Sequence, residues 1–301
     1  MVDIEKKAEL EILKQLGILE AGGFRGSKPQ KGNYCLETSI EGNTGKVKLQ
    51  VYYGKKGLKT VLQGDRDSKT YAEINKLLSN ELAFEKDDFV EPQQYIGTDE
   101  SGKGDFFGPL VIAGVFVDKE TKKKLEDLGV RDSKQVAHSS IKKLAENIKI
   151  ISGQNSFNVV VINPPRYNEL YEKFGNLNRL LAWGHARVLE NILSNREAPA
   201  AVSDKFGDER LILNSLQEKG KKLELYQFHK AEKYTAVAAA SILARDRFND
   251  WFEMKKREFK IDIPKGASGK VTETARKIRT EFGDEFLSQL IKTHFKTYRT
   301  L

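Results

Sequence analysis

The sequence predicts an α/β protein in two parts: a mixed sheet flanked by helices over residues 94–301, preceded by a small α+β domain over residues 1–85. Beyond residue 94, strand-like and helix-like patterns alternate, which is typical of α/β layers. The first 85 residues instead show one helix pattern, three strand patterns and a second helix pattern. Residues 86–93 are acidic and include a proline, which is typical of a linker.

The elements of the small domain are predicted from apolar spacing and turns. Apolar residues recur at helical spacing over 4–16, and Gly22, Gly23 and Gly26 end that helix. Asp67 and Ser68 are N-cap residues for a second helix that ends near residue 80. Alternating polar and apolar residues, separated by glycine-containing turns, predict strands at 33–40, 46–53 and 58–62.

The larger part alternates strands with helices and ends in a helical C-terminal region. One strand, at 109–117, is too apolar to face water on either side. The other strands are predicted at 94–98, 157–162, 200–203 and 223–228. Helices are predicted at 119–128, 139–150, 177–195, 209–219 and 232–257.

Composition restricts the classes to which the protein can belong. Hydrophobic residues at 39% and charged residues at 31% describe a globular chain. No apolar run approaches the length of a membrane span, and the charged, amphipathic N-terminus is unlike a secretory signal. Cys35 is the only cysteine, which excludes an intramolecular disulfide and a cysteine-rich zinc site. We therefore expect a cytoplasmic protein without membrane contact.

The net charge of +8 favours a polyanionic partner such as nucleic acid. Residues 25–59 hold eight Lys or Arg and two Glu, so eight minus two leaves six positive charges in the predicted sheet of the small domain. Tyr34, Tyr52 and Tyr53 are interleaved with these bases, as on nucleic-acid-binding surfaces. The alternative is an ordinary solvated sheet face whose tyrosines pack on a helix.

The segment 95–118 carries the first chemical signal. A predicted strand ends in Asp99 and Glu100 and is followed by Ser101, Gly102, Lys103 and Gly104. Carboxylates suit hard cations such as Mg²⁺, and a Gly-Lys-Gly turn suits phosphate or sugar. A charged hairpin turn without function would look the same, so this segment does not decide the function by itself.

Two further acids follow predicted strands. Asp204 follows the strand at 200–203, and Glu232 follows the strand at 223–228. Together with Asp99 and Glu100 they form a convergent carboxylate set, which is what a two-metal phosphodiester hydrolase requires. Neighbouring strand residues point to opposite faces, so the Ser101-Gly102 turn must re-aim Glu100 or its backbone must contribute instead.

Four motifs make the sequence resemble a type 2 ribonuclease H, and in particular ribonuclease HIII. These motifs are DESGKGDFFGPLVIAGV from Asp99, RDSK at 131–134, NLNRLLAWGHARVLE at 176–190 and AVAAASILAR at 236–245. The resemblance runs from about Tyr95 to the C-terminus and implies a ribonuclease H-like fold. The basic first domain matches, in position and style, the substrate-binding domain of ribonuclease HIII proteins, which is similar to a TATA-box-binding-protein repeat.

The resemblance implies an endonuclease that hydrolyses the RNA strand of RNA/DNA hybrids as a monomer with Mg²⁺ or Mn²⁺, leaving 5′-phosphate and 3′-hydroxyl ends. Asp99 would bridge two metal ions, and Glu100, Asp204 and Glu232 would complete the ligand set, with Asp246 as the alternative fourth ligand. Gly102, Lys103 and Gly104 would read ribose 2′-hydroxyls, the groups that distinguish RNA from DNA. Ser101 and Lys134 would lie near the scissile phosphate.

The histidines lack the spacing of a zinc site. We expect His185 to be a hydrogen-bonded core residue, His229 to lie at the edge of the site or in solvent, and the His294 segment to contact nucleic acid, fold back near the site or remain solvated. Three functions stay open: hybrid cleavage of the HIII kind, incision at single ribonucleotides of the HII kind, and non-catalytic binding of hybrids or DNA. Glu232 and the basic domain favour the first.

Overall fold

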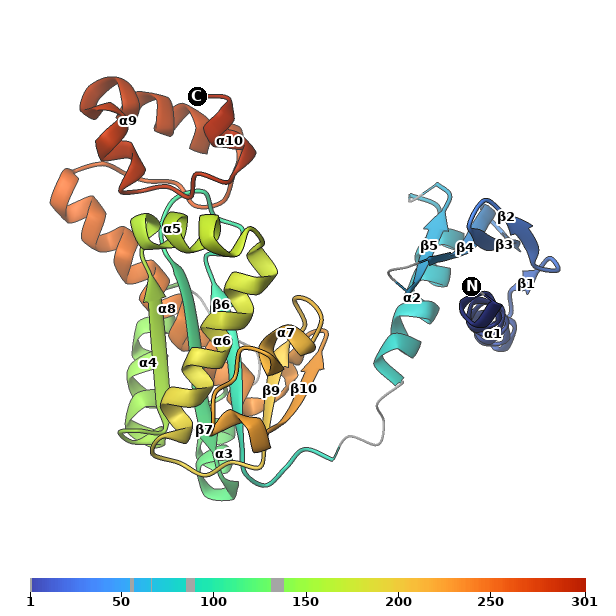
Figure 1. The fold of residues 1–301 in the computed structure, drawn as a ribbon, viewed down its shortest axis with the longest axis horizontal. Coiled ribbons are helices and arrows are strands. Elements are labelled where there is room, and N and C mark those ends of the chain that lie inside the picture. Colours follow the sequence, from blue (N-terminus) through green and yellow to red (C-terminus); the bar gives the residue numbers. More distant parts are fainter. Residues whose placement is uncertain (1, 55–56, 66, 85–89, 131–137) are drawn as a thin grey trace. The chain divides into compact units, whose positions relative to one another are not determined.

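The computed structural model describes residues 2–54, 57–65, 67–84, 90–130 and 138–301. The chain divides into two compact units, Met1–Val90 and Glu91–Leu301, and each is described by itself (Figure 1). Within the described residues each unit contains one five-stranded sheet.

The first unit is an antiparallel sheet covered by two helices. The helices are α1 (Val2–Ala21) and α2 (Lys69–Phe84), and the Ser68 hydroxyl accepts a hydrogen bond from Tyr71 N–H at 3.1 Å, as predicted for an N-cap. The strands are β1 (Arg25–Gly26), β2 (Gln30–Gly32), β3 (Cys35–Gly42), β4 (Gly45–Gly54) and β5 (Gly57–Gln63). Their order is β1-β3-β4-β5, with β2 paired to β3.

Side chains alternate between the two faces of this first sheet. On β4, Val47, Leu49 and Val51 are buried in one apolar cluster with Ile12 of α1 and Ile74 of α2. Lys48, Gln50 and Tyr52 occupy the alternate positions of β4 and form the outer face of the sheet with their neighbours on β3 and β5. The helices therefore cover one face and leave a polar, basic face.

The second unit is built on a mixed sheet of order β10-β9-β6-β7-β8. β6 pairs with β9 in parallel and with β7 in antiparallel orientation, while β10 runs parallel to β9 and β8 antiparallel to β7. The inner strand β7, between β6 and β8, is buried along its whole length, in agreement with its apolar sequence. The strands are β6 (Tyr95–Ser101), β7 (Leu110–Val117), β8 (Phe157–Ile162), β9 (Ala200–Asp204) and β10 (Glu224–Phe228).

Helices cover both faces of the second sheet. Figure 1 shows α5 and α6 on one face and α4 and α8 on the other. The α-helices are α3 (Lys119–Asp127), α4 (His138–Ser152), α5 (Pro164–Phe174), α6 (Leu177–Leu193), α7 (Arg210–Leu213), α8 (Thr235–Phe259), α9 (Gly269–Ser288) and α10 (Lys296–Arg299). Two 3-10 helices, η2 (Gly220–Lys222) and η3 (Ala231–Lys233), flank β10.

Gly97 sets the distance between β6 and α8. A Cβ atom at this position would lie 2.3 Å from the backbone nitrogen of Val237 and 2.3 Å from the carbonyl carbon of Ala236. Backbone atoms cannot yield as a flexible side chain can, so only glycine permits this approach. The first turn of α8 is thereby held directly against the strand that carries Asp99.

The predicted fold class, an α/β mixed sheet after a small α+β region, is confirmed. The helix predicted at 209–219 is wrong in length, because α7 ends at Leu213 and the chain continues through turns to η2. The helix predicted to begin at residue 232 begins three residues later, at Thr235, because residues 231–233 form η3. The helices α5 and α9 were missed. In the described part of the chain, no helix combines the length and apolarity needed to cross a membrane.

Candidate active site

Three parallel strands of the second sheet run to one edge: Asp99 lies two residues before the end of β6, Asp204 is the last residue of β9, and Glu232 comes four residues after β10. Thr98 of β6 lies opposite Ser203 of β9, so Asp99 and Asp204 are the next residues along two neighbouring strands. Phe228, the last residue of β10, lies opposite Asp204. Glu232 follows in η3, where the Ala231 N–H donates to Asp204 Oδ1 at 3.0 Å.

Asp99 faces α8 and is surrounded by other acids. Its Oδ1 accepts the Glu100 N–H at 2.8 Å, and Ser241 of α8 contributes a side-chain hydrogen bond. Burial, followed by the charges of Glu100 and Asp204, raises the pKa of Asp99 to about 7, although these hydrogen bonds oppose the rise. Carboxylates crowded in this way favour either a proton or a cation among them.

Glu100 stays within β6 and faces the opposite side of the sheet, toward α6. Its Oε2 lies 3.2 Å from His185 Nε2, and its Oε1 lies 3.4 Å from Lys103 Nζ. Burial alone would raise the pKa of Glu100, but these two partners outweigh it and hold the pKa below its ordinary value. One expectation was that the Ser101-Gly102 turn changes the direction of the Glu100 side chain. β6 continues through Ser101, so the turn does not do this.

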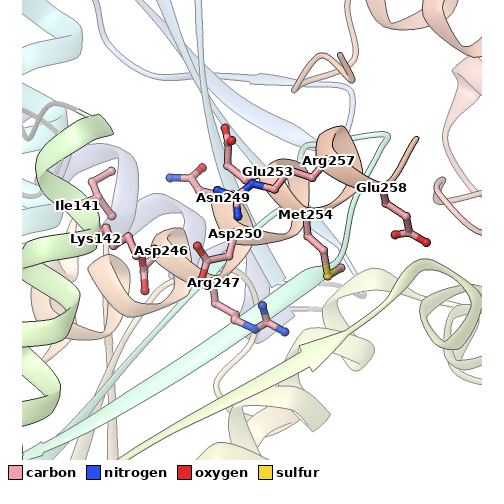
Figure 2. Close-up of a pocket in the computed structure, with 10 residues that line it drawn as sticks. All are labelled: Ile141, Lys142, Asp246, Arg247, Asn249, Asp250, Glu253, Met254, Arg257 and Glu258. Atoms are coloured by element: carbon pink, nitrogen blue, oxygen red, sulfur yellow. The ribbon is translucent and has the colours of Figure 1, made fainter. Parts of the chain in front are cut away.

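The alternative fourth acid, Asp246, has other neighbours. Its carboxylate is buried on α8 and pairs with Lys149 of α4 at 3.4 Å. It also lines a pocket of about 860 Å³ with Lys142 and Asp250, as Figure 2 shows. The charges that act most strongly on Asp246 are therefore those of Lys149, Asp250 and Lys142.

The described acids share an edge of the sheet but are not grouped as a metal site. Among the side chains that the structure describes, no three His, Cys, Asp or Glu are grouped so that they could hold a metal ion. The donors nevertheless have the chemistry of a site for a hard divalent cation, because carboxylate oxygens are the ligands that Mg²⁺ and Mn²⁺ prefer.

The Gly102-Lys103-Gly104 turn adjoins this edge. Gly102 has a φ of +91°, and a Cβ atom there would lie 2.2 Å from the carbonyl oxygen of Pro109, so the position requires glycine. Lys103 is partly exposed and lies 5.7 Å from the centre of the Phe206 ring. Ser101 is the half-buried last residue of β6. Lys134 and the rest of the RDSK motif lie outside the described residues.

A buried lysine that was not predicted from the sequence holds the loop after this turn. Lys292 is fully buried, and its Nζ donates to the carbonyl oxygens of Asp105 at 2.8 Å and Gly108 at 2.7 Å. Gly108 N–H donates to Leu290 O at 2.9 Å, and Phe107 forms a β-bridge with Ile291. The only signal was a lysine that follows the apolar pair Leu290-Ile291 near the C-terminus, and such a lysine is usually a surface residue.

The histidines differ in their surroundings. His185 is a hydrogen-bonded buried residue as expected, but one of its two partners is Glu100. His229 is exposed at the end of β10. His294 stacks on Tyr171 with ring centres 4.2 Å apart, and burial with the charge of Lys292 lowers the pKa of His294 to about 4. The C-terminal segment thus folds back onto α5 beside the loop 105–108.

Comparison with known proteins agrees with this fold. Residues 96–298 match the family model described as Ribonuclease HII. A ribonuclease HIII of Protochlamydia amoebophila (strain UWE25) is 44% identical over 208 residues, which cover 69% of this chain and 68% of that protein. A ribonuclease HIII of Chlamydia felis (strain Fe/C-56) is 42% identical over 209 residues, covering 68% and 69%.

Solved structures extend the likeness to nearly the whole chain. The crystal structure of Bst-RNase HIII in complex with Mn²⁺ is 26% identical with a TM-score of 0.63, and the match covers 95% of this chain and 94% of that one. Aquifex aeolicus RNase H3 is 29% identical with a TM-score of 0.57, covering 95% and 97%. Fold and sequence together define an endoribonuclease of the ribonuclease H class. Within that class, the chain belongs to the ribonuclease HIII family.

Proposed function

We propose that this protein hydrolyses the RNA strand of continuous RNA/DNA hybrids by a mechanism that uses two divalent metal ions, leaving 5′-phosphate and 3′-hydroxyl ends. The observation that carries the proposal is the convergence of Asp99, Asp204 and Glu232 at one edge of the sheet, with Glu100 adjacent. Family membership supports the reaction class, and the carboxylate edge supports the mechanism.

The donor set fits Mg²⁺ or Mn²⁺. The pKa of Asp99 is raised, as is typical of buried carboxylates with too little positive charge nearby. Bst-RNase HIII was crystallised with Mn²⁺, which supports the same choice of cation here. Such ions would activate water and stabilise the leaving oxygen of a phosphodiester. Since no three described acids are grouped as a metal site, we expect the carboxylates to rotate toward the cation when it binds.

The protein's own groups position the reaction. Asp99, Glu100, Asp204 and Glu232 would hold the cations, and the location of Asp246 against Lys149 supports Glu232 as the fourth ligand. The Gly102-Lys103-Gly104 turn would contact the ribose 2′-hydroxyls through its backbone, which glycine leaves accessible. Ser101 and Lys134 would approach the scissile phosphate.

The first unit would bind the substrate. Its outer sheet face carries Lys48, Gln50 and Tyr52, and Glu37 accepts hydrogen bonds from Lys48 at 3.1 Å and from Gln50 at 2.9 Å. Tyr34 on the connection between β2 and β3 is 79% exposed, which suits stacking or contact with a sugar. A basic, aromatic sheet face without an acidic edge of its own suits the holding of a duplex for the second unit to cut. We expect the enzyme to act as a monomer in the cytoplasm.

A second function has one observation in its favour. The family model that matches residues 96–298 carries the description Ribonuclease HII, and proteins of that kind incise DNA at single ribonucleotides. The additional basic unit favours the first function, because a reader of one junction does not need a second surface to hold an extended duplex. Non-catalytic binding of hybrids or DNA is the third possibility, and the retention of all four acids argues against it.

The deciding experiment compares two substrates under two metals. Initial rates are measured on a continuous RNA/DNA hybrid and on a DNA duplex with one embedded ribonucleotide, each with Mg²⁺ and with Mn²⁺. We expect efficient cleavage of the hybrid, little or no incision at the lone ribonucleotide and no activity in excess EDTA. Comparable kcat/KM on both substrates under Mg²⁺ supports the HII-like function instead, and full activity in EDTA contradicts the metal mechanism.

A further inference from the structure

We propose that His185 is a positioning residue that fixes the carboxylate of Glu100 for metal binding, and that Thr98 holds the imidazole ring in place through its other nitrogen. The inference rests on the proposed function, because it takes Glu100 to be a metal ligand. It concerns a different residue on a different element, since His185 belongs to α6 and contacts no other acid of the proposed set in the described contacts.

The alternation of β6 brings these groups together. Thr98 and Glu100 lie two residues apart on one strand, so their side chains leave the same face. That face is covered by α6, where the His185 side chain is completely buried. Its Nδ1 lies 2.9 Å from Thr98 Oγ1, and its Nε2 lies 3.2 Å from Glu100 Oε2. One imidazole ring therefore bridges two successive residues of that face.

The chemistry of the three side chains assigns the direction of these two hydrogen bonds. An ionised carboxylate can only accept, so His185 Nε2 must carry a hydrogen and donate it to Glu100. In the neutral ring, Nδ1 is then an acceptor, and the Thr98 hydroxyl donates to it. The order is Thr98 to His185 to Glu100: the carboxylate, which can only accept, fixes the tautomer, and the Thr98 hydroxyl, which can donate or accept, holds the ring at its other nitrogen.

The remaining contacts leave the ring little freedom. The imidazole stacks on Phe206, with ring centres 4.9 Å apart and planes 28° apart. Phe206 follows Asp204 by two residues, and Lys103 lies over its ring. Lys103 also approaches Glu100 Oε1 at 3.4 Å, so each carboxylate oxygen has its own partner. A buried ring with one defined orientation can restrict the rotation of Glu100, which an exposed partner such as Lys103 cannot do.

A matched pair of substitutions separates positioning from packing. In His185→Gln the side-chain NH₂ can reach the position of Nε2 and donate to Glu100. In His185→Asn the shorter amide can reach Thr98 only. Val188→Ala, on the same helix, removes buried volume without touching Glu100 and serves as the packing control. Mn²⁺ binding to each full-length protein without nucleic acid is followed by electron paramagnetic resonance of free Mn²⁺, with kcat and KM measured at saturating metal.

We expect His185→Asn to weaken Mn²⁺ binding about 10- to 100-fold, the usual effect of losing a group that orients a metal ligand. His185→Gln should restore most of that affinity, and Val188→Ala should lower thermal stability while binding Mn²⁺ as the wild type does. Equal affinities for His185→Asn and the wild type, or equal losses in the Asn and Gln variants, would overturn the proposal.

Two further variants complete the test. If His185→Asn does not fold, Thr98→Val decides: it keeps the ring and removes only the hydroxyl donor, so weaker Mn²⁺ binding supports the proposal and unchanged binding contradicts it. Glu100→Gln separates this inference from the proposed function. Normal Mn²⁺ binding in that variant removes Glu100 from the ligand set and overturns both, whereas loss in Glu100→Gln together with normal binding in His185→Asn overturns only the role of His185.

Discussion

The two units of this chain place their charges in opposite environments. In the first unit, Lys46 pairs with Glu41 while their side chains are 73% and 66% exposed, and Lys31 and Lys48 also pair with acids near the surface. In the second unit, Glu100 is only 10% exposed, and Asp99 is buried where the charges of Glu100 and Asp204 act on it. Exposed charges interact weakly and are screened by salt, whereas buried charges interact strongly and must be compensated.

This difference predicts which property each unit controls. Screened surface charges can adjust affinity for a polyanion without large effects on stability or chemistry. Buried carboxylates cannot be changed without altering the chemistry that they support. Variants of the first unit should therefore change KM and its salt dependence, and variants of the second should change kcat.

The largest effect is expected from the strand-end acids. Asp99→Asn, Glu100→Gln and Asp204→Asn should each lower kcat at least about 100-fold, because a lost metal ligand removes several kcal/mol of charge stabilisation and about 1.4 kcal/mol corresponds to tenfold in rate. Single-turnover cleavage of hybrid at saturating enzyme measures this directly. Glu232→Gln should behave in the same way. An active Glu232→Gln with an inactive Asp246→Asn would assign the fourth position to Asp246.

A smaller effect is expected from the first unit. Removal of residues 1–90 should raise KM for the hybrid strongly and leave kcat less affected, because that unit supplies affinity and not chemistry. If four of its surplus charges neutralise phosphates, the slope of log K against log salt should become shallower by roughly 3 to 4. Titrations of labelled hybrid between low and moderate salt measure the slope. Equal affinity of the truncated and intact proteins contradicts this role for the first unit.

The fold could be predicted from sequence wherever one face of an element is apolar. β7 is apolar throughout and is buried on both sides, and β3 and β4 of the first unit show a period of two. The length of the helix predicted at 209–219 was overestimated, because its apolar spacing continues past α7 into a turn. In that turn the backbone N–H groups of Gln217 and Gly220 donate hydrogen bonds to the buried Glu190 carboxylate. That partner lies on α6, far away in sequence, and periodicity cannot reveal it.

The location of Asp99, Asp204 and Glu232 at one edge was predictable, because parallel strands bring their carboxyl ends together. The partners of those acids were not. His185 looks like any core residue of an amphipathic helix until the register of β6 places Thr98 and Glu100 opposite it. Lys292 also gives no local signal, since its two carbonyl partners precede it by more than 180 residues. Hydrogen bonds between distant segments depend on the fold, and one residue's neighbours in sequence do not encode them.

The smallest expected effect concerns this buried lysine, whose environment is the reverse of the exposed lysines in the first unit. Burial lowers the pKa of Lys292 from 10.5 to about 7, although Asp105 partly opposes the shift. Below pH 7 the ammonium is charged in both folded and unfolded chains, and its burial opposes folding in full. Between pH 7 and about 10 the folded chain has lost this proton while the unfolded chain keeps it, so stability should rise with pH.

Lys292→Met isolates this contribution, since methionine fills much of the same volume and does not titrate. The free energy of unfolding of the wild type, minus that of Lys292→Met, should increase by up to about 1.4 kcal/mol per pH unit above pH 7. Urea unfolding at pH 7, 8 and 9 measures it, and His294, whose pKa lies near 4, does not titrate in this window. Parallel pH profiles would mean that Lys292 keeps its proton, held as an ammonium by the carbonyl oxygens of Asp105 and Gly108.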